Sequence, residues 1–252
     1  MAKQRGIIKL EGTIGDITFY KSPDGFLAKG KGGVPADKIA NDPAFQRTRE
    51  NGSEFGRAGK AGKLLRNAIR ALLINASDRL MVSRLTTDMV KVLQADATSV
   101  RGLRNVIDGE SEMLKGFEFN NRGRLATCMF ANYDAEIFRP DGKITINIPS
   151  FIPQNMLVAP GGSTHYKLVA AGLEIDFENE TFKIDNQETA TLPWDNVASA
   201  DINFVHAMTP ASTHPLFVVL GISFYQSING QMYSLKNGAY NALSIVKVDG
   251  GV

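Results

Sequence analysis

The sequence predicts an α+β protein in which helices and strands occupy separate stretches of the chain. Apolar residues recur at helical spacing between residues 43 and 115, whereas short runs rich in β-branched and aromatic residues dominate from residue 117 onward. Turn residues separate those runs about every 8 to 12 residues, a spacing typical of an antiparallel β-sandwich or barrel. We therefore expect an N-terminal β-hairpin arm, a small helical bundle and a C-terminal antiparallel β-sandwich or barrel.

The same patterns divide the 252 residues into three regions. Residues 1–40 are expected to form the β-hairpin arm and a Gly-rich linker, residues 41–116 a basic helical region, and residues 117–252 the β-sandwich domain. Hydrophobic residues make up 43% of the chain and charged residues 21%, which is typical of a folded chain with a sizeable core.

Three short apolar runs, at residues 7–10, 17–20 and 26–29, predict strands in the arm. The sequence Ser-Pro-Asp-Gly at residues 22–25 supplies Pro and Gly where a tight turn needs them, so the second and third runs are expected to pair. Residues 29–35 are rich in Gly, which favours a linker or an extended arm.

The apolar side chains of this arm need a partner. A two-stranded hairpin is marginally stable in water, and an uncovered strand edge recruits other chains. We expect the arm to pack either on the β-domain of its own chain or on that of a neighbour. The residues assigned to this self-assembly arm are Ile8, Leu10, Ile14, Ile17 and Phe19.

The helical region begins at Asn41-Asp42-Pro43, where an acidic cap precedes a first-turn proline. An amphipathic stretch runs from there towards residue 73, and further helices are expected at residues 78–95 and 98–115. Each glycine inside a helix costs about 1 kcal/mol relative to alanine, so a glycine-lined face predicts close approach of another backbone. The residues of this predicted close-packing face are Gly52, Gly56, Gly59 and Gly62.

From residue 117 onward, β-rich runs alternate with turn sequences. Strands are predicted at residues 117–119, 125–130, 143–148, 165–169, 173–177, 181–184, 202–205, 216–225, 231–235 and 243–248. No helical pattern interrupts them, which favours antiparallel pairing over crossover connections.

Charge is distributed unevenly along the chain. Residues 1–124 contain 22 Lys and Arg against 14 Asp and Glu, a net charge of +8, whereas residues 125–252 contain 6 against 12, a net charge of −6. Such asymmetry is typical of a chain that binds a polyanion or a second copy of itself. The expected basic ridge consists of Arg47, Arg49, Arg57, Lys60, Lys63, Arg66 and Arg70. It could bind nucleic-acid phosphates, lie on an anionic membrane, contact the acidic half of another copy, or be a solvated face.

Motifs that would indicate enzymatic chemistry are weak. Residues 25–32 match the start of a phosphate loop but lack the Ser or Thr that binds magnesium, so a hairpin arm is favoured. His165, His206 and His214 have no metal-ligand spacing and no local nucleophile. The alternating acids are Glu174, Asp176, Glu178 and Glu180, which could hold calcium or serve as paired acids, although a solvated strand face is the commoner explanation.

These observations predict a protein without catalytic residues, metal or cofactor, and without a small-molecule substrate. The single cysteine, Cys128, cannot form an internal disulfide. The N-terminus lacks a secretory apolar segment, and no run approaches the roughly 18 apolar residues of a membrane span. We therefore expect a cytoplasmic protein, or one exported only by a non-Sec route.

Several segments resemble an uncharacterised protein family of Bacteroidota. The resemblance rests on Gly12-x-x-Gly15-x-x-x-Phe19-Tyr20, on Asp24-Gly25, on residues 41–51 and 54–60, on Ile148-Pro149-Ser150-Phe151-Ile152-Pro153 and on His214-Pro215-Leu216-Phe217. It extends over most of the chain and implies a single architecture, but no catalytic residues and no mechanism.

The preferred hypothesis is a non-enzymatic structural subunit. It would assemble into a filament or particle through head-to-tail charge complementarity and N-terminal strand contacts. The alternative is a nucleic-acid-associated protein that binds phosphates through the basic helical region. A third, less favoured hypothesis is a carbohydrate-binding or hydrolytic β-domain that uses Trp194, Asp176 and His165.

Overall fold

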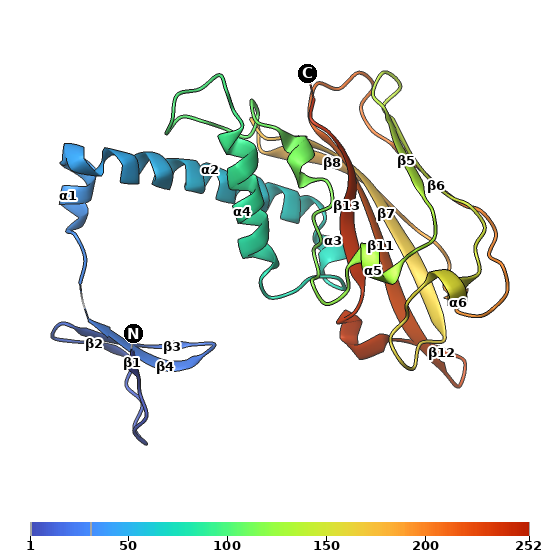
Figure 1. Ribbon diagram of the computed structural model, residues 1–252, viewed down its shortest axis with the longest axis horizontal. Coiled ribbons are helices and arrows are strands. Elements are labelled where there is room, and N and C mark those ends of the chain that lie inside the picture. The colour runs from blue at the N-terminus through green and yellow to red at the C-terminus, as the bar shows by residue number, and fades with distance from the viewer. Residues whose placement is uncertain (1, 31, 252) are drawn as a thin grey trace. The chain divides into compact units, whose positions relative to one another are not determined.

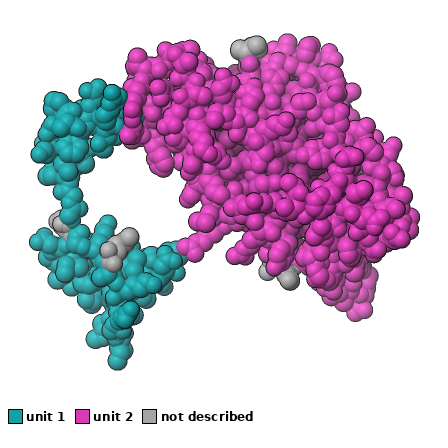
Figure 2. All heavy atoms as spheres, viewed as in Figure 1, with its two compact units in different colours: residues 1–50 teal, residues 51–252 magenta. Residues whose placement is uncertain are grey.

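The computed structural model describes residues 2–30 and 32–251 and confirms the α+β class, with 26% helix and 34% strand. The chain divides into two compact units, residues 1–50 and residues 51–252 (Figure 2). This differs from the three predicted regions. The helices of residues 51–94 share one hydrophobic core with the β-sheet, so helical region and β-domain form a single unit.

The N-terminal unit contains a four-stranded antiparallel sheet with the strand order β1-β4-β3-β2. Its strands are β1 (Ala2–Lys3), β2 (Gly12–Ile14), β3 (Ile17–Ser22) and β4 (Gly25–Gly30). The predicted hairpin is confirmed, because β3 and β4 pair across the turn from Ser22 to Gly25.

The predicted strand at residues 7–10 is wrong: these residues belong to the segment between β1 and β2. The side chain of Gln4 satisfies the backbone there, because Oε1 accepts from Leu10 N at 2.9 Å and Nε2 donates to Leu10 O at 3.2 Å. These bonds replace a strand partner for the backbone of Leu10. The unit also contains α1 (Ala36–Asn41) and the 3-10 turn η1 (Pro43–Phe45), where the carboxylate of Asp42 accepts from Ala44 N as a cap.

The helices of the second unit are α2 (Gln46–Ala68, which begins in the first unit), α3 (Arg70–Leu73) and α4 (Met81–Gln94). No described helix has the length and hydropathy of a transmembrane span. The predicted helix at residues 98–115 is wrong, since only the 3-10 turn η2 (Ser111–Leu114) forms there. The buried carboxylate of Asp96 accepts from the backbone of Thr98, Ser99 and Asn105, and thereby folds the segment into a loop.

Two antiparallel sheets make up the β-region. The large sheet contains β7 (His165–Asp176), β8 (Thr181–Glu188), β9 (Leu192–Pro193), β11 (Leu216–Ile228), β12 (Gln231–Ser234) and β13 (Ala242–Asp249). The small sheet contains β5 (Asp134–Phe138), β6 (Lys143–Ile148) and β10 (Ile202–Ala207). The predicted strand at residues 125–130 is instead the helical turn α5 (Leu125–Cys128), and β5 was not predicted. A further turn, α6 (Pro153–Met156), precedes β7.

The large sheet lies between two other layers (Figure 1). Phe217 and Val219 of β11 face a core shared with α2, α3 and α4. Leu216, Val218 and Leu220 face a second core shared with the small sheet. Because both faces of β11 are covered, its sequence is a nearly continuous apolar run instead of an alternating one.

Candidate assembly surfaces

The N-terminal sheet has no hydrophobic core of its own. None of the described residues 2–30 and 32–50 is buried, and neither core of the protein contains a residue before Ala58. Within the predicted arm, Ile8 is 79% exposed and Ile14 is 63% exposed. Leu10 and Ile17 are exposed as well, and Phe19 is half-buried. The arm residues therefore lie together in one exposed unit.

Cations over aromatic rings partly replace a core in this sheet. The ammonium groups of Lys9 and Lys21 lie 5.9 and 5.6 Å from the centroid of the Phe26 ring, and that of Lys29 lies 5.8 Å from the Tyr20 ring. Exposed contacts of this kind contribute about 0.5–1 kcal/mol each. They leave the isoleucine side chains uncovered.

Three members of the predicted basic ridge hold local structure. Arg47 forms an exposed ion pair with Glu50 at 3.0 Å. The guanidinium of Arg49 donates to Ile39 O at 2.7 Å and Asp42 O at 3.0 Å, which ties α2 to the preceding turn. Arg57 donates to the backbone carbonyls of residues 102 and 104, both at 2.8 Å, and anchors the loop after α4.

The side chains of the other four members bind no other helix, turn or loop among the described residues. Arg66 donates to Gly62 O of its own helix at 3.2 Å. Lys60, Lys63 and Arg70 are exposed, and none of their side chains has a hydrogen bond or ion pair with another described residue. The charge available to a partner is therefore concentrated in the second half of α2 and at the start of α3.

The predicted close-packing face is formed by only one of its four glycines. Gly62 packs on α4, where an added Cβ would lie 3.6 Å from the Leu85 side chain. An added Cβ at Gly52, Gly56 or Gly59 would meet nothing within 4 Å among the described residues. The expectation of close helix packing at these three positions is wrong for the single chain, because they lie on the outward face of α2.

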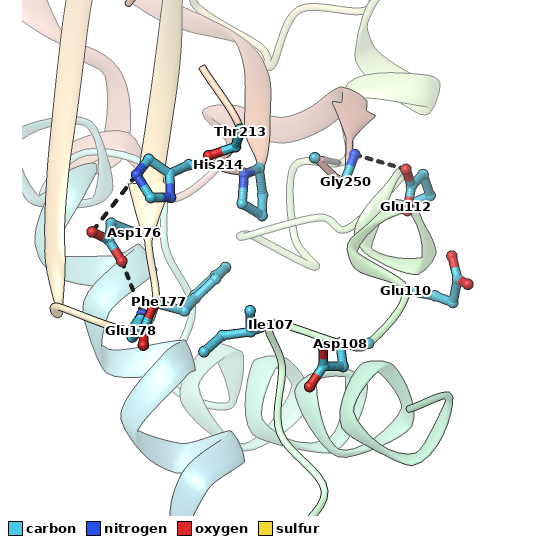
Figure 3. A pocket seen from close by; sticks show the side chains of 13 residues that line it. Ile107, Asp108, Glu110, Glu112, Asp176, Phe177, Glu178, Thr213, His214 and Gly250 are labelled. Atoms are coloured by element: carbon cyan, nitrogen blue, oxygen red, sulfur yellow. Dashed lines mark hydrogen bonds and ion pairs between the residues drawn. The ribbon is translucent and has the colours of Figure 1, made fainter. Parts of the chain in front are cut away.

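An acidic pocket of about 360 Å³ lies at the end of β7 (Figure 3). Its carboxylates are those of Asp108, Glu110, Glu112, Asp176 and Glu178. Two of them bind the backbone: Glu112 accepts from Gly250 N at 2.7 Å, and Asp176 accepts from Asn179 N at 2.9 Å. Hydrogen bonds from Asn179 hold the pKa of Asp176 below its ordinary value, which suits a structural carboxylate better than a general acid.

The remaining predicted polar residues do not assemble into one site. His165 and Asp176 are the first and last residues of β7, roughly 36 Å apart at the rise of a strand, so a site combining them with Trp194 is not formed. Glu174 is buried and accepts from Ser212 Oγ at 2.6 Å. Among the described residues no group of three His, Cys, Asp or Glu side chains could hold a metal ion.

The phosphate-loop match and the other two histidines also have structural explanations. Residues 25–30 form strand β4, and Lys31 lies outside the described residues. His206 is fully buried and stacks on the Phe204 ring, 6.3 Å between centroids. His214 lies 3.7 Å from the carboxylate of Asp176 at the edge of the acidic pocket.

The sequence interpretation missed an apolar pocket of about 260 Å³. It is lined by Pro153, Tyr166, Leu192, Pro193, Asp195, Val197, Ala198, Ser199, Ala200 and Ile202. Tyr166 is fully buried, and its hydroxyl has no hydrogen-bond partner among the described residues. Burial, together with the nearby charge of Asp195, raises the pKa of Tyr166 to about 12, so the hydroxyl stays neutral. No local motif signals this pocket, because three separate segments form it.

Comparisons with known proteins do not identify the chain. No protein-family model matches it, and no curated protein matches it. A solved structure of the human F-spondin reeler domain aligns with 50% of this chain and 99% of that chain, with 12% sequence identity and a TM-score of 0.17. A similarity at that level supports no argument about fold or function.

Proposed function

We propose that the protein is a non-enzymatic structural subunit that assembles with copies of itself into a filament or particle. The observation that carries this proposal is the N-terminal sheet, in which none of the described residues is buried. A small sheet without a core does not bury enough apolar surface to offset the entropy of ordering its backbone. Contact with another chain supplies the missing burial.

Charge favours a second copy as that other chain. Residues 1–50 contain nine Lys and Arg against six Asp and Glu, whereas residues 125–252 have a net charge of −6. Opposite charges on two different surfaces promote a head-to-tail contact between copies. A head-to-tail contact that does not close into a ring produces an open polymer.

The experiment compares the full chain with arm variants by light scattering and negative-stain microscopy, at low and at high salt. We expect large assemblies of the full chain that shrink at high salt and disappear when residues 2–20 are removed. The point variant Ile14→Asn/Ile17→Asn should weaken assembly at least tenfold, because both side chains are exposed in the sheet.

The matched control is Val100→Asn/Leu103→Asn, which removes two aliphatic side chains that are at least as exposed but lie in the second unit. It should leave assembly unchanged. A full chain that stays monomeric at high concentration under every salt condition overturns the proposal.

A second candidate function is nucleic-acid binding. It is favoured by one observation, the exposed cations of Lys60, Lys63 and Arg70 that have no partner within the described chain. Phosphate contacts release counterions, so affinity for DNA or RNA should fall steeply with salt and drop on charge reversal at Lys60, Lys63 and Arg70. Absence of any binding at low salt removes this candidate.

A further inference from the structure

The tip of the segment between β1 and β2 carries the two most exposed large apolar side chains of the described residues. Ile7 is 102% exposed and Ile8 is 79% exposed. Lys9 follows them, and its ammonium donates to Gln4 O at 2.6 Å and Gly6 O at 2.8 Å. The ammonium also lies 5.9 Å from the centroid of the Phe26 ring, and of its three donors one has no acceptor atom and is available to a carboxylate. The tip therefore presents two aliphatic side chains next to a cation.

The apolar pocket at residues 192–202 has the complementary chemistry. Val197, which lines the pocket, is 68% exposed and so leaves an apolar surface open to a partner. Asp195 accepts from Val197 N through Oδ1 at 3.0 Å, and its second carboxylate oxygen has no described partner. A carboxylate oxygen beside an apolar cavity suits a lysine that follows two aliphatic residues.

The size of the pocket favours side chains over a cofactor. Its volume of about 260 Å³ lies below the ~300–1,000 Å³ typical of small-molecule sites. A cavity of ~150 Å³ accommodates one benzene, so this pocket has room for one or two aliphatic side chains. Tyr166 lines this pocket, and its buried hydroxyl has no hydrogen-bond partner among the described residues.

We propose that this pocket receives the Ile7–Ile8 tip of a second copy, with Lys9 pairing with Asp195. The inference rests on the proposed self-assembly and names the acceptor for its arm. The occupant is a second copy because the tip is uncovered and because tip and pocket carry opposite charges.

Disulfide trapping between copies tests this contact. In a Cys128→Ser background, copies carrying Ile8→Cys are mixed with copies carrying Val197→Cys under mild oxidation, and the mixed dimer is identified by mass. Each copy then contains one cysteine, so every cross-link joins two copies. The matched control is Val100→Cys, the same residue type at 70% exposure. We expect at least fivefold more mixed dimer with position 197 than with position 100.

Filling the pocket provides a second measurement. Ala198→Trp places a large ring in the pocket lining, and Ala97→Trp places the same ring at an exposed alanine in the loop after α4. The first variant should weaken assembly at least tenfold and the second should not. Thermal unfolding of both variants shows whether the fold is retained, and the cross-linking result does not depend on the tryptophan variants.

Each outcome has a distinct meaning. Assembly that depends on the arm but shows equal cross-linking at positions 197 and 100, and equal effects of the two tryptophans, overturns the pocket as acceptor and leaves the proposed function intact. A monomeric full chain overturns both. Ile8–Val197 cross-links that form only within a dilute double-cysteine chain show that the arm packs on its own chain. A small molecule that co-purifies with the wild type but not with Ala198→Trp also contradicts the proposal.

Discussion

At Asp96, hydrogen bonds converge on one buried carboxylate. Oδ1 accepts from Thr98 N at 2.8 Å, Thr98 Oγ1 at 2.9 Å and Ser99 N at 2.9 Å, while Oδ2 accepts from Asn105 N at 3.1 Å. Burial alone raises the pKa of such an acid, but these bonds outweigh it and hold the pKa of Asp96 far below its ordinary value. The residue is therefore a charged loop anchor.

Arg139 has a comparable role in the second unit. Its guanidinium binds the Asp249 carboxylate at 2.6 Å and donates to the carbonyls of Ser212 and His214 at 2.5 and 2.9 Å. These bonds join the last strand to the loop before β11. Asp96 and Arg139 are charged residues of the kinds found in active sites, but in this protein they stabilise loops.

The titration of His206 predicts a pH dependence of stability. Burial holds its pKa below the ordinary value of 6.5, in spite of the Asp185 carboxylate 3.7 Å away. The unfolded chain then binds more protons than the folded one between the lowered pKa and 6.5. Stability should fall as pH drops through that interval, by up to roughly 1.4 kcal/mol per pH unit. Urea unfolding between pH 5 and 8 measures this slope.

Two substitutions test the assignment to His206. His206→Phe should flatten the slope because it removes the titrating ring. Phe204→Leu, which alters the stacked neighbour without removing a titrating group, should lower stability and keep the slope. An unchanged slope in His206→Phe contradicts the assignment.

At the scale of elements, α2 has two different faces. Ala58 and Leu65 are fully buried against the sheet and α4, whereas Phe55 on the outward side is 62% exposed. The outward glycines have open space around them. They reduce helix stability in the single chain without any compensating contact among the described residues.

Substitutions at two glycines should have opposite effects. Gly56→Ala should stabilise the fold by about 0.5–1 kcal/mol, because the residue is helical and its Cβ meets nothing within 4 Å. Gly123→Ala should destabilise it by about 1–3 kcal/mol, because its Cβ would clash with the backbone carbonyl oxygen of Tyr240. Urea denaturation measures both. A destabilised Gly56→Ala would show that the outward face packs on something.

Substitutions in the basic ridge should distinguish cations that stabilise the fold from cations that do not. Arg57→Ala should cost about 1–3 kcal/mol and speed hydrogen exchange at residues 98–107, since two carbonyls of that loop lose their donor. Lys60→Ala, one turn further along the same helix, should change neither quantity beyond about 0.5 kcal/mol. Equal effects of the two variants would contradict this division.

At the scale of the whole molecule, the second unit contains both hydrophobic cores. Every buried residue of either core lies between Ala58 and Val248, and the helices cover one face of the large sheet while the small sheet covers the other. None of the described residues of the N-terminal unit contributes a side chain to either core. The fold of the second unit is therefore expected not to depend on the N-terminal unit, which the proposed assembly requires.

Removing residues 2–45 tests this separation. The shortened protein should unfold with a free energy within roughly 0.5 kcal/mol of the full chain, because the deletion removes no core residue. Circular dichroism during urea unfolding gives the comparison under conditions where the full chain is dissociated. A loss of several kcal/mol would mean that the N-terminal residues support the fold of the second unit.

The sequence by itself determined the α+β class, the hairpin at residues 22–25 and most strands of the β-region, since these depend on turn residues and on local periodicity. It also predicts that the arm needs a partner, because isoleucines on a small sheet cannot be covered by that sheet alone.

Only the tertiary structure decided which local preferences prevailed. The spacing of apolar residues at 98–115 suits a helix, but the Asp96 side chain accepts hydrogen bonds from the backbone N–H groups of Thr98 and Ser99, and the segment forms a loop. The sequence suggests that Arg57 is a free cation, but in the fold its guanidinium donates to the carbonyls of residues 102 and 104. The pocket around Tyr166 joins residues 153, 166 and 192–202. In each case the decisive partner is distant in the chain or is a side chain instead of the backbone, and periodicity encodes neither.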